Sequence, residues 1–166
     1  MSQVTASILV RASLAETWDH YFDARGWSVW VDGFQASESA EGYPDEGGTL
    51  TWRSVPAGRG RVSERVLEHQ PRRRHRIAFT DPQSEGELLT EMAIEGEATR
   101  VTQTTDYRLG GGPFAWVSDR LFVRSQMRGS LERSLMRFKH EVEEVAALGT
   151  EGGMGRTPDG QPAETA

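Results

Sequence analysis

Before residue 110, apolar and polar residues alternate along most of the chain, which is the period of strands with one buried face. One strand is expected from Val4 to Arg11, and about six more are expected between Phe34 and Leu109. The pattern predicts a curved antiparallel sheet of six or seven strands. The last two strands are expected to form a hairpin whose turn is Glu-Gly-Glu-Ala-Thr, residues 95–99. Its inward positions are expected to be Phe34, Ala36, Leu50, Trp52, Val62, Glu64, Val66, His75, Ile77, Phe79, Leu88, Thr90, Met92, Ile94, Val101, Gln103, Thr105 and Tyr107.

Two short helices are expected between the first and second strands. The sequence Ser13-Leu-Ala-Glu16 is a capping box, in which the serine side chain and the glutamate side chain each satisfy a backbone amide at the start of a helix. It predicts a helix from Leu14 to Tyr21. A second helical or turn segment is expected from Ala24 to Val31.

A long helix is expected to complete the fold. After Gly-Gly-Gly-Pro113, whose proline suits a first helical position, the apolar period changes to spacings of four and three residues. A single helix cannot fill the concave side of a curved sheet, so a cavity is expected between them, and the predicted fold class is α+β. The stripe expected to face the sheet is Val117, Leu121, Arg124, Arg128, Leu131, Leu135, Phe138, Val142 and Val145.

Composition narrows the classes of function. The net charge of −6 over 166 residues argues against a general nucleic-acid-binding protein. The basic run Pro71–Arg76 is expected to be a solvated strand end, with contact to a phosphate or anionic headgroup as the alternative. The chain has no cysteine, which excludes disulfides and thiolate chemistry.

The length of 166 residues predicts one domain, and a cytoplasmic location is expected. The first residues show no signal-peptide pattern, and no apolar run approaches the roughly 20 residues of a membrane span. Residues 1–148 are expected to form the domain. Residues 149–166, rich in glycine, proline and small polar residues, are expected to be a disordered tail.

Aromatic residues are concentrated between Trp18 and Phe34. Trp18 shares a helical face with Leu14 and is expected in the core. Trp27 and Trp30 are three residues apart, so they project from one side of a helical turn. We predict that these two and Phe34 lie beside the cavity entrance, and the alternative is that they seal the core.

Four polar residues occupy inward strand positions. Glu64 is either an anchor or general base in the cavity, or it faces solvent in a shifted register, because a lone buried charge is costly. Gln103 and Tyr107 either bind a ligand or hydrogen-bond one another or nearby backbone. His75, at the start of its strand beside the basic run, is expected at the rim.

Arg124 and Arg128 are the polar positions of the long helical stripe. They either extend to solvent along their aliphatic stems or face the cavity. In the cavity, a guanidinium would pair with Glu64 or hold a carboxylate, phenolate or enolate of a ligand.

Other chemistries find no support in the sequence. The four histidines show no spacing typical of metal ligands, and the nucleophile-elbow, P-loop and dinucleotide motifs are absent. We therefore expect no metal and no cofactor.

Four segments and the order of elements resemble a known family. The segments are VRASLAETWDHY (10–21), GWSVWVDGF (26–34), VSERVLEHQPRRRHRIAF (62–79) and GEATRVTQTTDY (96–107). The chain from Val4 to about Glu144 resembles the START-like, or SRPBCC, superfamily, and within it the polyketide cyclase/dehydrase and lipid-transport branch. The resemblance implies a helix-grip fold, with the sheet wrapped around the C-terminal helix, and a cavity for a hydrophobic or aromatic molecule.

The resemblance does not identify an activity, because proteins of this superfamily include aromatase/cyclases, carriers, receptors and chaperone-linked modules. Our first hypothesis is binding of a lipid or polyketide-like small molecule by a monomer or homodimer. The second is an aromatase/cyclase or dehydratase, with Glu64 and Arg128 as candidate catalytic groups. The third is an interaction module resembling activators of chaperone ATPases. The residues expected to contact a ligand are Trp27, Trp30, Phe34, Trp52, Glu64, Ile77, Phe79, Thr90, Met92, Gln103, Tyr107, Leu121, Arg124 and Arg128.

Overall fold

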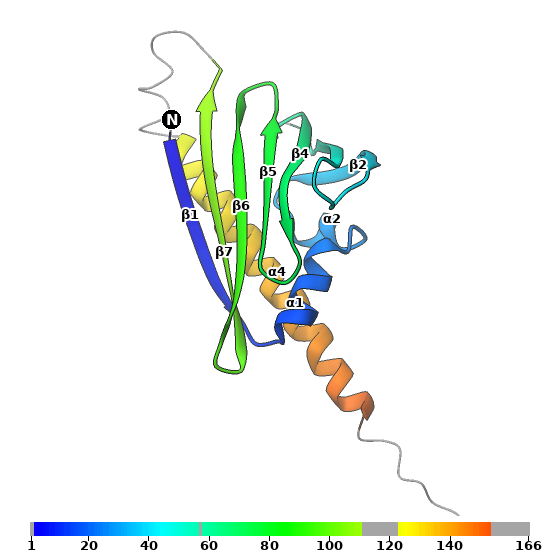
Figure 1. The fold of residues 1–166 in the computed structure, drawn as a ribbon. Helices are drawn as coiled ribbons and strands as arrows, with labels where there is room; N and C mark the ends of the chain where they lie inside the picture. The colour runs from blue at the N-terminus through cyan, green and yellow to red at the C-terminus, as the bar shows by residue number, and fades with distance from the viewer. Residues whose placement is uncertain (1, 57, 111–122, 154–166) are drawn as a thin grey trace, which may run out of the picture.

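A computed structural model describes residues 2–56, 58–110 and 123–153, with side chains as far as Leu148 (Figure 1). Seven strands form one antiparallel sheet in the order β1-β7-β6-β5-β4-β3-β2. Strands β2 to β7 follow one another as a meander, and β1 pairs with β7 at the far edge, which confirms the predicted sheet. The strands are β1 (Ser2–Val10), β2 (Phe34–Glu41), β3 (Thr49–Ser54), β4 (Arg61–Gln70), β5 (Arg74–Thr80), β6 (Ser84–Glu95) and β7 (Ala98–Leu109).

The helices of the described residues lie on one side of this sheet (Figure 1). The helix α4 (Arg124–Gly153) crosses its concave face, and α1 (Leu14–Phe22) and α2 (Trp27–Trp30) lie beside α4. The capping box forms as predicted: the Glu16 amide donates to Ser13 Oγ at 3.2 Å, and the Ser13 amide donates to Glu16 Oε2 at 3.0 Å. This is the helix-grip arrangement expected from the sequence.

The core lies between α4 and the sheet. Leu135, Phe138 and Val142 of α4 are almost fully buried. The Phe138 ring lies 4.9 Å from the ring of Trp30 and 5.7 Å from that of Tyr21, measured between centroids. Phe138 therefore joins the long helix to both short helices.

The buried stripe of α4 differs from the prediction at both ends. Val123, Met127 and Ala146 pack against the core, whereas Arg124, Arg128 and Val145 are exposed. A spacing of alternately four and three residues averages 3.5 per turn, and an α-helix has 3.6, so the predicted stripe drifts away from the real one over several turns. The predicted helix start at Pro113 and its inward residues Val117 and Leu121 lie outside the described residues. At the other end α4 continues to Gly153, beyond the expected start of the tail at residue 149.

Two inward positions of the sheet were also predicted wrongly. A register shift between Phe34 and Ala36 interrupts the pairing of β2 with β3, and Ala36 is exposed. Such a bulge breaks the alternation of faces. Ile94 lies at the turn end of the β6–β7 hairpin and is exposed.

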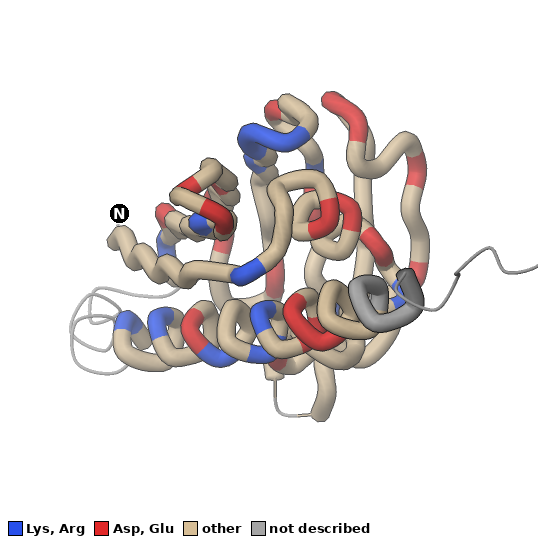
Figure 2. The backbone as a smooth tube through the Cα atoms, turned by 90° about the horizontal axis from the view of Figure 1, so that it is seen from below, with Lys and Arg blue, Asp and Glu red and all other residues tan. Residues whose placement is uncertain are grey.

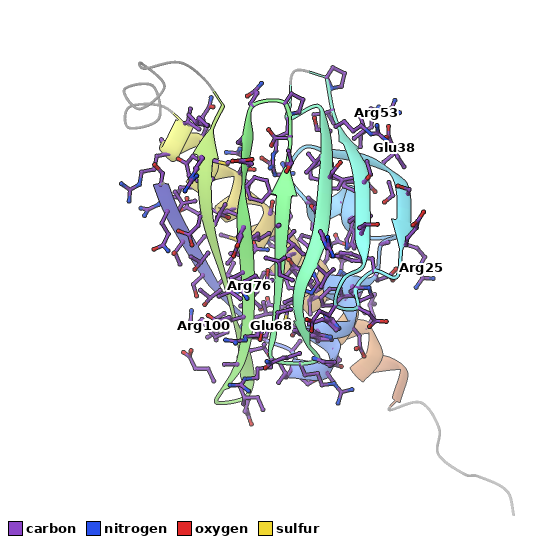
Figure 3. The ribbon with its side chains drawn as sticks, turned by 45° about the horizontal axis from the view of Figure 1, so that its top comes forward. Arg25, Glu38, Arg53, Glu68, Arg76 and Arg100 are labelled. Atoms are coloured by element: carbon purple, nitrogen blue, oxygen red, sulfur yellow. The ribbon has the colours of Figure 1, made fainter. Side chains whose placement is uncertain are left out.

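The outer face of the sheet is polar and carries ion pairs (Figure 3). Arg53 reaches Glu38 at 2.6 Å and Arg74 reaches Glu68 at 2.8 Å, each between neighbouring strands. Exposed pairs of this kind contribute about 0–1 kcal/mol each, so burial on the inner face dominates stability. The long helix α4 carries both basic and acidic residues along its length (Figure 2). Within the described residues, no helix is both long enough and apolar enough to cross a membrane.

Candidate functional site

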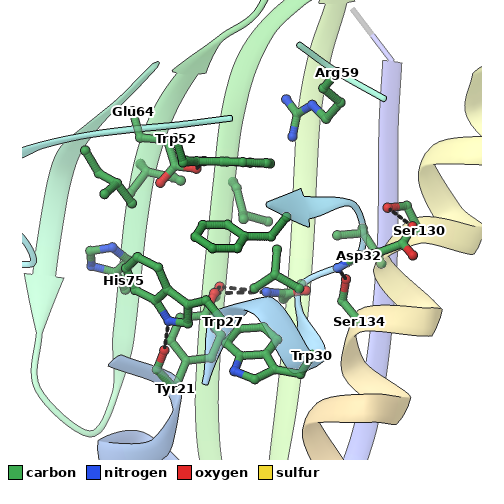
Figure 4. Close-up of a pocket in the computed structure, with 18 of the residues that line it drawn as sticks. Tyr21, Trp27, Trp30, Asp32, Trp52, Arg59, Glu64, His75, Ser130 and Ser134 are labelled. Carbon is green, nitrogen blue, oxygen red and sulfur yellow. Dashed lines mark hydrogen bonds between the residues drawn. The ribbon is translucent and has the colours of Figure 1, made fainter. Parts of the chain in front are cut away.

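A cavity of about 130 Å³ lies between the inner face of the sheet, α2 and α4. In Figure 4, Trp52 and Glu64 lie above this space and Tyr21 and Trp30 lie below it. Asp32 lies at its side, next to Ser130 and Ser134 of α4. The lining is largely aromatic, with a few polar groups. It consists of Tyr21, Trp27, Trp30, Val31, Asp32, Phe34, Tyr43, Leu50, Trp52, Arg59, Glu64, His75, Ile77, Leu88, Thr90, Gln103, Ser130, Leu131 and Ser134.

One side of the cavity is a neutral hydrogen-bonded cluster of Tyr21, Thr90 and Gln103. The Tyr21 hydroxyl lies 2.9 Å from Thr90 Oγ1, and Gln103 Nε2 donates to the Tyr21 hydroxyl at 3.0 Å. Burial raises the pKa of Tyr21, and its hydrogen bonds only partly oppose that shift. The cluster therefore stays uncharged near neutral pH.

The opposite side carries the carboxyl group of Glu64, on β4. Trp52 Nε1 donates a hydrogen bond to Glu64 Oε1 at 2.7 Å. Burial raises the pKa of Glu64, while the Trp52 hydrogen bond and the positive charge of Arg59 partly oppose it. Glu64 thus holds its proton to a higher pH than an exposed glutamate does.

Arg59 comes from the loop between β3 and β4 and lies over the aromatic wall. Its guanidinium carbon is 4.7 Å from the Phe79 ring centroid and 5.9 Å from that of Trp52. It is also ion-paired with the buried carboxylate of Asp81, with Nε 2.7 Å from Oδ2. Arg59 therefore brings a fixed positive charge close to Glu64.

His75 and Tyr43 are two further ionisable residues that line the cavity. His75 Nδ1 lies 3.0 Å from His69 Nδ1, so one ring nitrogen donates to the other. Burial, with a smaller contribution from His69, lowers the pKa of His75 to about 4. Burial also holds the pKa of the Tyr43 hydroxyl well above its ordinary value, and the charge of Glu64 adds to this. Both groups are therefore neutral near pH 7.

Asp32, directly after α2, fastens this part of the wall to α4. Its carboxylate accepts hydrogen bonds from Ser130 Oγ at 2.9 Å and from Arg133 Nη2 at 2.8 Å. Its backbone amide donates to Ser134 Oγ at 2.9 Å. The contacts hold Trp30 and Val31 against the helix.

Four buried polar atoms of lining residues have no hydrogen-bond partner within the described residues: Trp30 Nε1, His75 Nε2, Gln103 Oε1 and Arg59 Nη2, the last of which is ion-paired with Asp81. A buried unpaired group of this kind costs about 1–3 kcal/mol. These groups therefore have hydrogen-bonding capacity that no described residue uses. No group of three histidine, aspartate or glutamate side chains converges to hold a metal ion in the described parts of the chain.

The family model described as polyketide cyclase/dehydrase and lipid transport matches residues 1–143. The chain belongs to this family. No curated protein sequence matches it. Among solved structures, a protein from Thermus thermophilus has 24% sequence identity and a TM-score of 0.66, over 88% of this chain and 99% of that one.

Two further structures show how widely this fold is used. Norcoclaurine synthase from Thalictrum flavum, in complex with dopamine and hydroxybenzaldehyde, is 13% identical with a TM-score of 0.66, over 86% of this chain and 87% of that one. The Aha1 dimer from Colwellia psychrerythraea is 14% identical with a TM-score of 0.62, over 86% and 97%. At these identities the likeness shows the polyketide cyclase-type fold alone.

The structure brings together most of the residues expected at the site. Glu64 faces inward in the predicted register, and Trp18 is buried in the core away from the cavity. Gln103 bonds to Tyr21 in the cavity lining. The expected residues that line the cavity are Trp27, Trp30, Phe34, Trp52, Glu64, Ile77, Thr90 and Gln103.

Other expected positions do not line the cavity. Phe79, Met92 and Tyr107 are buried in the sheet but outside the lining, and Leu121 lies outside the described residues. Arg124 and Arg128 are exposed, because the stripe of α4 that faces the sheet runs through Met127, so the anchoring role considered for them is wrong.

His75 is a second correction, since it is buried rather than at the rim. A histidine beside Arg74 and Arg76 has the sequence pattern of a strand end at the surface, but alternation turns its ring inward while both arginines face outward. Tyr43, Arg59 and Asp32 also line the cavity and were not predicted at the site. These residues lie in connections outside the regular strands and helices, where periodicity gives no signal.

Proposed function

We propose that this protein binds a small, mainly hydrophobic molecule with one aromatic ring and one polar group. The observation that carries the proposal is an aromatic cavity in which the carboxyl group of Glu64 is held in place by Trp52. The cavity volume of about 130 Å³ is close to the roughly 150 Å³ of apolar cavities that hold benzene. The ring would lie among the tryptophans, and its polar group would bond to Glu64.

Binding of phenol and benzyl alcohol, measured by isothermal titration calorimetry and saturation-transfer NMR, tests this proposal. We expect saturable binding to the wild type. We expect none to Leu131→Trp, which places a large ring in the cavity lining. Met136→Trp, on the exposed side of α4, is the matched control and should bind as the wild type does.

Absence of saturable binding to the wild type, or unchanged binding to Leu131→Trp, would contradict the proposal. Native mass spectrometry of protein purified from its source would then identify the natural ligand by mass. A co-purifying molecule whose ring system is much larger than one ring would contradict the size argument.

A second candidate function is proton-transfer catalysis, as in a cyclase or dehydratase. The observation that favours it is the raised pKa of Glu64, which burial causes, because a carboxylate with a raised pKa is a stronger base. Ionised Glu64 would remove a proton from a carbon next to a ligand carbonyl. The electron pair of the broken C–H bond would move into an enolate, and return of the proton would restore the carbonyl compound.

Deuterium exchange into the methylene group of phenylacetone, followed by NMR in D₂O, tests this step. We expect exchange above the buffer rate in the wild type, rising with pH as Glu64 ionises. Glu64→Gln should abolish the exchange while still binding phenylacetone. Equal exchange in both proteins would reject catalysis by Glu64 and leave the binding proposal standing.

An open cavity does not favour the third hypothesis, an interaction module whose core is filled by its own side chains.

A further inference from the structure

A shallow groove lies next to the cavity, between the end of α2, the β3–β4 loop and α4. Its apolar lining includes Val31, Phe34, Val55 and Pro56, and its polar lining includes Asp32 and Arg137. Val31, Asp32 and Phe34 line both the groove and the cavity. The two spaces therefore adjoin, with these three residues at their common boundary.

The groove exposes apolar surface and a positive charge at the same place. Val55 is exposed there, and Val29 of α2 is exposed close by in the sequence. The Asp32 carboxylate faces two guanidinium groups, those of Arg133 and Arg137, which leaves an excess of one positive charge. Asp32 remains ionised, because hydrogen bonds from Arg133 and Ser130 and the charges of both arginines outweigh the burial that would raise its pKa.

Arg137 is the guanidinium of this pair with capacity for a second anion. Arg133 contacts Asp32 with Nε at 3.3 Å and Nη2 at 2.8 Å, whereas Arg137 makes a single contact at 3.4 Å. Asp32 is the acidic group within 4.0 Å of Arg137 among the described residues, and the Arg137 side chain is 49% exposed. A guanidinium with free donors binds a carboxylate through two parallel hydrogen bonds.

The cavity is too small to enclose a ligand much larger than one ring, so the rest of such a ligand would extend into the groove. Sites for drug-sized ligands have volumes of about 300–1,000 Å³, and the cavity of about 130 Å³ accommodates little beyond one ring. We infer that the groove is the outer half of the binding site, and that it receives an apolar chain ending in a carboxylate, which pairs with Arg137. This inference rests on the proposed function, because it assumes that the ring of the same ligand occupies the cavity.

A series of ω-phenylalkanoates with two to seven methylene groups, each compared with the alcohol of equal length, tests the inference. Dissociation constants would be measured by calorimetry at low ionic strength. Once the chain is long enough to reach Arg137, we expect the carboxylate to bind roughly threefold to tenfold more tightly than the alcohol. The preference should shrink in 0.5 M salt, because Arg137 is half exposed.

Arg137→Gln should remove the preference for the carboxylate and leave the affinity of the alcohols unchanged. Arg65→Gln makes the same change of charge on the exposed face of β4 and should retain the preference. A preference that is absent from the wild type at every length, or that survives in Arg137→Gln, would overturn the inference. If benzyl alcohol binds but longer chains gain nothing, the inference alone fails; if no probe binds, the proposed function fails with it.

Discussion

The two sides of the cavity bury polar groups in different ways. On one side Tyr21, Thr90 and Gln103 are neutral groups that hydrogen-bond mainly to one another. On the other side, Glu64 and His75 are ionisable groups whose pKa values burial shifts in opposite directions, upward for the acid and downward for the base. The first side has the character of structural packing. The second keeps chemically adjustable groups beside a ligand-sized space, which is a common property of functional sites.

We call the side with Tyr21, Thr90 and Gln103 the neutral side, and the side with Glu64 and His75 the ionisable side. The largest expected effect tests whether the neutral side depends on the packing of α4. Phe138→Ala removes the ring that contacts Tyr21 and Trp30, so we expect a loss of about 3–5 kcal/mol in the free energy of unfolding, measured with urea. Met136→Ala, on the exposed side of the same helix, is the control and should change this free energy by no more than about 0.5 kcal/mol. Similar losses in the two variants would show that the neutral side does not depend on Phe138.

The next effect tests whether the ionisable side makes stability depend on pH. The pKa of His75 is about 4 in the folded protein, where the ring is only 2% exposed, and 6.5 is the ordinary value for the unfolded chain. The unfolded chain therefore binds the proton first as pH falls, so the contribution of His75 is present above pH 6.5 and is lost between pH 6.5 and 4. The difference between a pKa of 6.5 and one of about 4 corresponds to roughly 3 kcal/mol.

His75→Gln should therefore lose less stability than the wild type between pH 7 and pH 4, in urea titrations at each pH. His140→Gln, at an exposed position of α4, is the control and should show the wild-type pH dependence. Parallel curves for the wild type and His75→Gln would remove the basis for the contrast between the two sides.

The smallest effect is expected from the neutral side. Tyr21→Phe leaves Gln103 and Thr90 to a longer mutual contact of 3.4 Å, and we expect a cost of about 1–2 kcal/mol. The cost should be the same at pH 5 and pH 8, because the cluster is neutral at both. Thr5→Val, which removes an exposed hydroxyl 3.2 Å from that of Thr104, is the comparison and should cost less than about 0.5 kcal/mol. A strongly pH-dependent cost for Tyr21→Phe would mean that the two sides are electrostatically coupled.

The parts of the molecule that could be predicted from the sequence depend on the spacing of residues within a single strand or helix. The strands and the Ser13–Glu16 cap could be predicted from residues close together in the sequence. The alternation of apolar and polar residues along β4 was enough to predict that Glu64 faces inward. The approximate helical period was sufficient for Leu135 and Phe138 but not for Arg124, several turns away, where small errors accumulate.

The remaining parts depend on contacts between segments distant in the sequence. Asp32 meets Arg133 about a hundred residues later in the chain. The pKa of His75 depends on the rings that pack around it from α1 and from the β2–β3 connection, those of Phe22 and Tyr43. No pattern within one segment encodes such a contact, so the charges of the cavity lining could not be derived from the sequence.

The contacts of Asp32 with α4 also have a kinetic consequence. One residue joins the short-helix wall to the long helix through its carboxylate and its backbone amide, so separating these two walls requires several contacts to break together. The strength of these contacts would therefore set how readily the two walls move apart around a bound ligand. Residence time would then respond to changes at Asp32 even where equilibrium affinity does not.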